Sequence, residues 1–294
     1  MVLESLTDVH FIRRNPVVML FLAIVVSSVG MWIAYFTFPE SASVLAIANI
    51  AIALVPIMHR LFIVEEVCEI MKPGGAFGFL ARHGCALKIY TWLFIGLIVS
   101  YAFWYVAMPV DVKASVFSQQ DHELDKISDL KNQLTGNAYM PVTACAHDFW
   151  CWFQLVMYNN ASVLLWAILF SFIYGAGAIF LISWNASIIG VVVGRDIIGL
   201  IASYTHLGVG WDLIAAYMHG LFNALGFLPH GLPEALGYFI GAFAGAIISV
   251  AISKRQYRSK EFETIAKDAF ILMLIALLFI VIGALIEAYL LICM

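Results

Sequence analysis

The sequence predicts an all-α, polytopic membrane protein with about seven transmembrane helices and one broken or re-entrant helix. Of its 294 residues, 63% are hydrophobic and only 12% are charged, whereas roughly a quarter of the residues in a soluble domain are charged. Several apolar segments also exceed the ~20 residues that a helix needs to cross ~30 Å of hydrocarbon. Strands of about ten residues with alternating polarity, the pattern of an outer-membrane barrel, are absent from the sequence.

Hydropathy places the seven spans in order along the chain. They cover about residues 16–38, 42–62, 87–108, 162–184, 186–204, 232–253 and 268–291. The segment before the first span lacks the short apolar core and the cleavage site of a signal peptide, so we expect this span to be retained. A further apolar segment at 211–228 is interrupted by Asp212, His219 and Asn223. It is too short and polar for a crossing, which favours a re-entrant or interfacial helix.

Basic residues set the predicted orientation. Most of the 15 Lys and Arg residues precede the first span, lie between the second and third spans, or lie between the last two. Because cytoplasmic segments are enriched in Lys and Arg, we expect a multi-pass protein of the cell membrane with its N-terminus in the cytoplasm. The small net charge of -4 gives no indication of nucleic-acid binding.

This orientation divides the chain into regions. They are a three-span N-terminal region with a cytoplasmic amphipathic segment (1–109), an extracytoplasmic loop (110–152), a membrane core (153–253), and a basic cytoplasmic loop with the final span (254–294). In the loop, residues 121–131 have the hydrophobic spacing of a surface helix. Cys145 and Cys151 lie in the same loop, where an oxidising compartment would allow a disulfide; two unpaired thiols are the alternative.

Polar residues inside the apolar segments are candidates for a functional site, because they need internal partners or a cavity. The candidates are Asn159, Asn160, Asn185, Arg195, Asp196, Asp212, His219, Asn223, His230 and Glu234. We expect the asparagines to join helices through hydrogen bonds of about 0.6–2 kcal/mol each, and Asn185 to meet Glu234. Arg195 and Asp196 interrupt an apolar run. This predicts either an internal charge cluster, with Glu234 or Asp212 as the partner of Arg195, or a broken helix that lines a cavity.

The stretch from His230 to Glu234 opens the sixth span with a histidine, a proline and a carboxylate. Four positions apart on one helix, His230 and Glu234 would share a face, where a proton relay or a metal could be placed. Proline favours the first turn of a helix, however, so Pro233 predicts a helix that begins near Leu232, with His230 in the preceding turn. Glu234 would then lie near the positive end of the helix dipole and stabilise the helix start, which is the preferred interpretation.

Glycines provide a separate signal for helix packing. The candidates are Gly175 and Gly177 in the fourth span and Gly237, Gly241 and Gly245 in the sixth. The four-residue spacing of the last three predicts a small-residue face on which another helix lies closely, within the protein or between copies.

Four landmarks follow one another after the extracytoplasmic loop. They are Tyr158-Asn159-Asn160, Gly175-Ala176-Gly177, residues 185–194 (Asn-Ala-Ser-Ile-Ile-Gly-Val-Val-Val-Gly) and residues 229–234 (Pro-His-Gly-Leu-Pro-Glu). In this order and spacing, residues 153–253 resemble the stage II sporulation protein M family. The resemblance implies a membrane-embedded organiser of partner proteins, since family members in sporulating bacteria are scaffolds for cell-wall hydrolases during engulfment. Ala186 and Ser187 depart from the glycine that the family usually has after Asn185.

His219 and Asn223 also invite comparison with intramembrane glutamate–histidine proteases, in which a glutamate activates water while histidine and asparagine stabilise the oxyanion. The arginine that these proteases need after their glutamate pair is Ile70 here, and Phe227 precedes His230 by three residues rather than four. The sequence has no phosphate-binding loop, dinucleotide fingerprint, serine-nucleophile elbow or zinc signature. We therefore expect no catalytic residue, no metal site and no cofactor.

The preferred prediction is a non-enzymatic membrane scaffold or subunit. Its expected partners are the lipid bilayer, other membrane or extracytoplasmic proteins and further copies of itself, but not nucleic acid. The alternative is a transporter or channel in which Arg195, Asp212, His230 and Glu234 line a hydrated cavity for an anion or a small solute. A water-accessible cavity that joins these residues would favour transport, whereas a dry polar cluster would favour the scaffold.

Overall fold

The computed structural model describes residues 9–70, 78–125, 148–174, 178–203, 209–224, 226, 228–253 and 260–293. The regular elements in these residues are all helices. They are α2 (Val9–Arg14), α3 (Val18–Thr37), the 3-10 helix η1 (Pro39–Ser41), α4 (Ala42–Ile70), α5 (Gly78–Ala107), α6 (Val110–Val116), α8 (Phe149–Tyr174), α9 (Ala178–Ser203), α10 (Val209–Ala224), α11 (Leu228–Ser253) and α12 (Lys260–Cys293). Residues 118–125 are also helical, and we name this stretch helix 118–125.

Within the described residues, seven helical segments are long and apolar enough to cross a membrane, so the predicted fold class is confirmed. The segments are Val18–Thr37, Pro39–Leu61, Lys88–Ala107, Phe149–Ser171, Ile179–Ala202, Pro229–Ser249 and Ile265–Ile292. α10 is not one of them, because its 16 residues extend only about 24 Å as an α-helix. The protein is therefore a multi-pass helical membrane protein.

The boundaries of the fourth span differ from the prediction. The sequence suggested a span from Ser162 to Trp184, whereas α8 begins at Phe149 and ends at Tyr174, and α9 follows from Ala178. The prediction was wrong because it treated the two asparagines before Ser162 as too polar to lie within a span. In the structure both asparagines lie within α8, where their amides are hydrogen-bonded.

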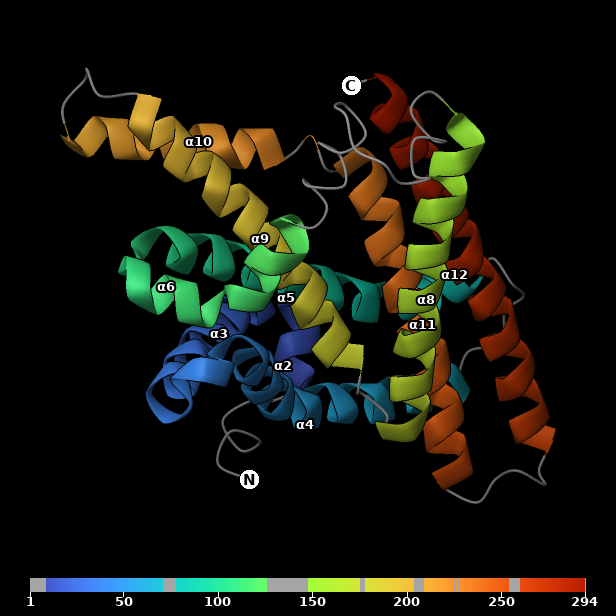
Figure 1. The fold of residues 1–294 in the computed structure, drawn as a ribbon. Coiled ribbons are helices and arrows are strands. Elements are labelled where there is room, and N and C mark those ends of the chain that lie inside the picture. Colours follow the sequence, from blue (N-terminus) through green and yellow to red (C-terminus); the bar gives the residue numbers. More distant parts are fainter. Residues whose placement is uncertain are drawn as a thin grey trace.

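The helices form two groups that pack against each other (Figure 1). α3, α4, α5 and α9 make up the first group, and α8, α11 and α12 make up the second, on the right of Figure 1. α9 also contacts α8, and α11 contacts α4 and α5, so a continuous apolar core joins the two groups. The starts of α8 and α11 and the end of α12 lie together at the top of Figure 1, where α10 also lies. We refer to this end of the protein as the α10 end.

Glycines allow α9 to lie directly against α5. A Cβ atom at Gly190 would lie 2.5 Å from Tyr101 Cβ, and one at Gly194 would lie 2.7 Å from Tyr105 Cδ1. Because neither position has room for a larger residue, the two helices approach each other as closely as small-residue motifs permit. Both glycines belong to the third sequence landmark, residues 185–194, which is thus a packing surface.

The outward faces of the spans are apolar. On α3 the exposed residues include Phe21, Val25, Val29, Ile33 and Phe36, and on α12 they include Phe270, Leu274, Leu278, Leu285 and Tyr289. Lipid tails are as apolar as these side chains, so the two faces are suited to direct contact with the bilayer.

α10 also has one exposed apolar face. Trp211, Ile214, Met218 and Phe222 are exposed on it. On the opposite side, a Cβ atom at Gly220 would lie 2.4 Å from Ile197 Cγ1 of α9. This amphipathic pattern is the one that an interfacial helix has, with one face on the protein and one available to lipid.

Candidate functional site

A polar cluster lies inside the second helix group. It consists of Asn160 on α8, Glu234 and Tyr238 on α11, and Glu287 on α12, and we name it the Glu234 cluster. Asn160 Nδ2 donates to Glu234 Oε1 at 2.7 Å, and the Tyr238 hydroxyl donates to Asn160 Oδ1 at 3.0 Å. Asn160 is 4% exposed and Tyr238 is 8% exposed. The Asn160 amide therefore uses both of its ends to join α8 to α11 in a buried position.

A glycine on α12 provides the space for the Glu234 side chain. A Cβ atom at Gly283 would lie 2.5 Å from Glu234 Cγ and 3.2 Å from Glu234 Oε1. Glu287 follows Gly283 by four positions, so the two residues lie on one face of α12. The Glu287 carboxyl group is within hydrogen-bonding reach of Glu234. Three helices thus meet at a single carboxyl group.

α11 begins at Leu228, so the predicted helix start near Leu232 is wrong by one turn. The reason is that Pro229 occupies the first turn, where proline is favoured, and Pro233 lies inside the helix. His230 and Glu234 therefore share a helix face. The His230 carbonyl oxygen lies 3.2 Å from the position of a Cβ atom at Gly283, which places this turn directly against α12.

The other two candidate asparagines have different surroundings. Asn159 is exposed, and its Nδ2 atom donates to Asn160 Oδ1 at 3.2 Å. Asn185 is half-buried, and its Nδ2 atom donates to the carbonyl oxygen of Leu181 at 2.9 Å within α9. Asn160, rather than Asn185, is thus the asparagine that binds Glu234. Asn185 lines a small cavity beside Tyr238, so it adjoins the Glu234 cluster without a hydrogen bond to Glu234.

A second polar cluster surrounds Arg195 of α9, and we name it the Arg195 cluster. Arg195 Nη2 lies 2.5 Å from Asp121 Oδ1, and Nη1 lies 3.0 Å from Asp125 Oδ1. The same Asp121 oxygen accepts from Arg195 Nε at 3.0 Å and from the Tyr105 hydroxyl at 2.9 Å. The side chain of Arg195 is 36% exposed and that of Asp121 is 26% exposed. The partners of Arg195 are therefore the carboxylates of helix 118–125, not those that the sequence suggested.

Helix 118–125 is also fixed to the core beside this cluster. Gln120 is 1% exposed. Its Oε1 atom accepts from Ser43 Oγ of α4 at 2.7 Å, and its Nε2 atom donates to Ser187 Oγ of α9 at 3.1 Å. The region 110–152, predicted as an extracytoplasmic loop, thus begins with helical residues bonded to α4 and α9.

Sequence reasoning missed the acidic partners in both clusters, although a signal existed for each. Asp121 and Asp125 are four positions apart, which places both carboxylates on one helix face. Glu287 is the one charged residue between Ala269 and Cys293, and a lone charge in a span indicates a specific partner. All three acids lie outside residues 153–253, the region in which the polar candidates were identified.

The remaining polar candidates are not brought into either cluster. Asp196 is half-buried on α9, and His219 and Asn223 are exposed on α10. Asp212 belongs to α10, but its side chain lies outside the described residues. In the part of the chain that the structure describes, no three His, Cys, Asp or Glu side chains are arranged to hold a metal ion.

Cys151 lies in the first turn of α8 and is disulfide-bonded. Cys145, the partner that the sequence suggested, lies outside the described residues, so this pairing stays a prediction.

The glycine face of α11 packs within the chain. A Cβ atom at Gly237 would lie 3.0 Å from the Ala276 carbonyl oxygen of α12, and one at Gly245 would lie 2.6 Å from the Ile168 carbonyl oxygen of α8. A Cβ atom at Gly241 would lie 2.4 Å from Leu164 Cδ1, also on α8. These three positions are buried. Gly175 and Gly177 lie outside the described residues.

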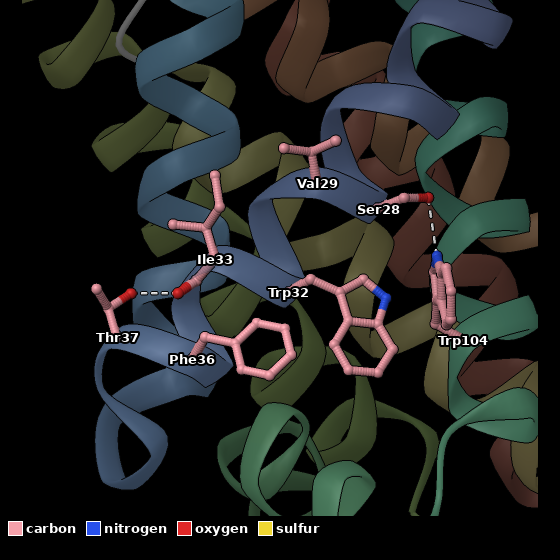
Figure 2. A pocket seen from close by; sticks show the side chains of 7 residues that line it. All are labelled: Ser28, Val29, Trp32, Ile33, Phe36, Thr37 and Trp104. Atoms are coloured by element: carbon pink, nitrogen blue, oxygen red, sulfur yellow. Dashed lines mark hydrogen bonds between the residues drawn. The ribbon is translucent and has the colours of Figure 1, made fainter.

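An open apolar groove runs along α3 beside α5 (Figure 2). The rings of Trp32 and Phe36 stack with centroids 5.6 Å apart, and Trp104 meets Trp32 edge-on at 5.4 Å. Trp104 Nε1 donates to Ser28 Oγ at 2.8 Å, one of the bonds drawn in Figure 2. The groove has a volume of about 550 Å³ and no charged residue in its lining. Because Val29 and Phe36 are exposed, the groove belongs to the lipid-facing surface.

The fold and these two clusters define a class of protein: a multi-pass helical membrane protein whose intramembrane polar residues pair between helices of one chain. The family model of Stage II sporulation protein M matches residues 17–290. The chain belongs to this family. The resemblance noted in residues 153–253 is confirmed, and it extends over the N-terminal spans as well. No curated protein and no solved structure matches the chain significantly.

Proposed function

We propose that the protein is a non-enzymatic scaffold of the cell membrane, which presents its extracytoplasmic segment to partner proteins. The observation that carries the proposal is the pairing of Arg195 with Asp121 and Asp125. Arg195 is the intramembrane charge that most strongly suggested a transport pathway, and these contacts give it a structural use. They also fix the start of the segment between α5 and α8 to the membrane core.

The strength of this attachment supports a scaffold. Asp121 Oδ1 accepts from two guanidinium nitrogens and from the Tyr105 hydroxyl, so its charge is spread over several donors. Charge-assisted hydrogen bonds of this kind are roughly twice as strong as neutral ones. A segment that is ordered before its partner arrives loses less conformational entropy on binding. Helix 118–125 is therefore suited to receive another membrane or extracytoplasmic protein.

The described cavities offer no support for the transport alternative. The cavity between the two helix groups has a volume of about 10 Å³, which is at the lower limit for a single water molecule of ~10–15 Å³. The groove in Figure 2 is apolar and open toward lipid. Arg195 and Glu234 line neither of these spaces and belong to separate clusters.

Site-specific photo-crosslinking in native membranes tests the proposal. A photoreactive residue replaces His122, which is exposed on helix 118–125, and a control replaces Phe270, which is exposed on α12. We expect a discrete crosslinked protein from position 122 and lipid alone from position 270. In an Arg195→Gln background, the yield at position 122 falls, because the helix loses its attachment.

Reconstitution into liposomes tests the transport alternative. Liposomes that contain the purified protein are assayed for flux of protons, inorganic anions and small charged solutes. We expect flux no greater than in protein-free liposomes. Flux that depends on Glu234 or Arg195, together with no protein crosslink from position 122, would replace the scaffold by a transporter.

A further inference from the structure

The groove of Figure 2, which we name the α3 groove, has an aromatic wall that the protein itself holds in place. Trp104 Nε1 donates to Ser28 Oγ at 2.8 Å, and Ser28 Oγ donates to the carbonyl oxygen of Ile24 at 2.6 Å. The ring of Phe103 meets Trp104 edge-on, with centroids 5.2 Å apart. The position of the Trp104 ring is therefore set before any molecule enters the groove.

The other walls of the α3 groove are flat and apolar. The ring planes of Trp32 and Phe36 differ by 25°, and both rings turn a face toward the viewer in Figure 2. Trp104 lies at 85° to Trp32 and closes one side. Val29 and Ile33 add exposed alkyl groups. The volume of about 550 Å³ falls in the range of small-molecule sites, ~300–1,000 Å³.

The chemistry of this lining selects a hydrocarbon. The hydroxyl groups of Ser28 and Thr37 donate to carbonyl oxygens one turn earlier in α3. Trp104 Nε1 uses its single hydrogen in the bond to Ser28, and Figure 2 shows the ring nitrogen of Trp32 on the side of Trp104. Sites for polar ligands have several polar groups that converge on the ligand. The described lining instead presents ring faces and alkyl groups.

The length of the α3 groove matches one leaflet of a bilayer. Its lining on α3 extends from Ser28 to Thr37, which is about 13.5 Å at 1.5 Å per residue. Half of a hydrocarbon core of ~30 Å is close to this length. Because Thr37 is the last residue of α3, the groove runs from the end of the span toward its middle. A transmembrane helix of another chain would cross both leaflets, whereas a lipid chain ends near the middle of the bilayer.

We propose that the α3 groove is a binding site for one hydrocarbon chain of a membrane lipid, in the leaflet that contains the ends of α3 and α5. The chain lies on the ring faces of Trp32 and Phe36 and against Trp104. The polar head of the lipid lies beyond Thr37, in the direction of η1, which follows α3. This site does not involve helix 118–125 and is independent of the scaffold role.

Two physical terms favour the groove over an open helix face. A chain in the groove touches protein atoms on several sides, and the dispersion attraction of these contacts adds up. The fixed Trp104 ring also loses little conformational freedom when the chain binds, so less of the attraction is offset. The chain in the groove is therefore exchanged for other lipid less readily than chains on the exposed face of α12.

Photolabelling of the whole protein tests the site. The protein is placed in phosphatidylcholine nanodiscs in which a small fraction of the phosphatidylcholine has a diazirine on one acyl chain. Adducts are mapped by mass spectrometry. We expect roughly 3–10-fold more adduct on the groove residues of α3 than on the exposed face of α12 around Leu278, because an additional aromatic contact changes an equilibrium by about this factor.

A pair of variants tests whether the groove causes the preference. Ile33→Trp fills the α3 groove, and Leu278→Trp is the matched control on α12; the two positions are 51% and 57% exposed. We expect labelling of the groove to fall to the level of the α12 face in Ile33→Trp and to stay unchanged in Leu278→Trp.

Three results would overturn the proposal. The first is equal labelling of the two faces in the wild type, and the second is groove labelling that Ile33→Trp leaves unchanged. The third is an unlabelled groove together with a photo-crosslink from position 29 to another protein chain, because a helix then occupies the groove in place of a lipid.

Discussion

The packing of α11 against α8 predicts a measurable penalty for a single added methyl group at Gly245. In Gly245→Ala the new Cβ atom would lie 2.6 Å from the Ile168 carbonyl oxygen and 3.1 Å from Ser171 Cβ, whereas ordinary van der Waals contact begins at 3.4 Å. The nearest atom belongs to the backbone and cannot rotate away, so the two helices must separate. Overpacking of this kind costs about 1–3 kcal/mol.

The higher helix propensity of alanine offsets part of this packing penalty, and the sizes of the two terms decide whether the substitution stabilises or destabilises the protein. Alanine is favoured over glycine inside a helix by about 0.8–1 kcal/mol. The clash is with the backbone, so we expect the packing cost to lie in the upper part of its range. After the gain in propensity is subtracted, Gly245→Ala should lower the free energy of unfolding by about 1–2 kcal/mol. Gly241→Ala costs less, because its nearest contact is the end of the flexible Leu164 side chain at 2.4 Å.

Gly199→Ala is the matched control. Gly199 lies on α9, and a Cβ atom there would have no neighbour within 4 Å. This variant should raise the free energy of unfolding by about 0.5–1 kcal/mol through propensity alone. The assay is unfolding in mixed micelles by titration with sodium dodecyl sulfate, followed by tryptophan fluorescence. The packing argument is refuted if Gly245→Ala is as stable as Gly199→Ala.

Three further predictions concern the Arg195 cluster, the Glu234 cluster and the Cys151 disulfide. A double-mutant cycle of Arg195→Gln and Asp121→Asn should give a coupling free energy of about 1 kcal/mol, since the bonds are charge-assisted but partly exposed; additive effects in the same unfolding assay would contradict the pairing. Asn160→Ala leaves the Glu234 oxygen without its donor and should cost about 1–3 kcal/mol, whereas Asn159→Ala, at an exposed position, should cost less than half as much. The Cys151 thiol should react with maleimide only after reduction, and Cys151→Ser should lower stability by about 2–4 kcal/mol; a maleimide adduct mapped to Cys151 itself in the unreduced wild type would exclude the disulfide.

The helical class and the spans near the two termini were predictable, because long apolar runs leave few alternatives in a bilayer. The fourth span was not. Hydropathy treats Asn159 and Asn160 as polar residues that end a span, and it cannot register that Glu234 and Tyr238 hydrogen-bond to the Asn160 amide. The position of a span then depends on a tertiary contact, which no local pattern contains.

The candidate site was predictable to a similar degree. Glu234 and Asn160 stand out as polar residues in apolar segments, and the structure brings them together. Arg195 was also identified, but its partners lie 70 and 74 positions earlier, in a segment that resembled a loop. Pairings at such a distance along the chain depend on how the helix groups pack, so the sequence indicates which charges need partners without indicating the partners themselves.

The Arg195 cluster also bears on how the chain enters the membrane during synthesis. An arginine near the centre of a helix raises the free energy of membrane insertion by about 2.5–3.5 kcal/mol. Asp121 and Asp125 precede α9 in the chain, so they have already been synthesised when Arg195 arrives. Their carboxylates then lower the cost of inserting α9. Loss of these acids would therefore reduce the fraction of correctly inserted protein before it affected the stability of the molecules that had folded.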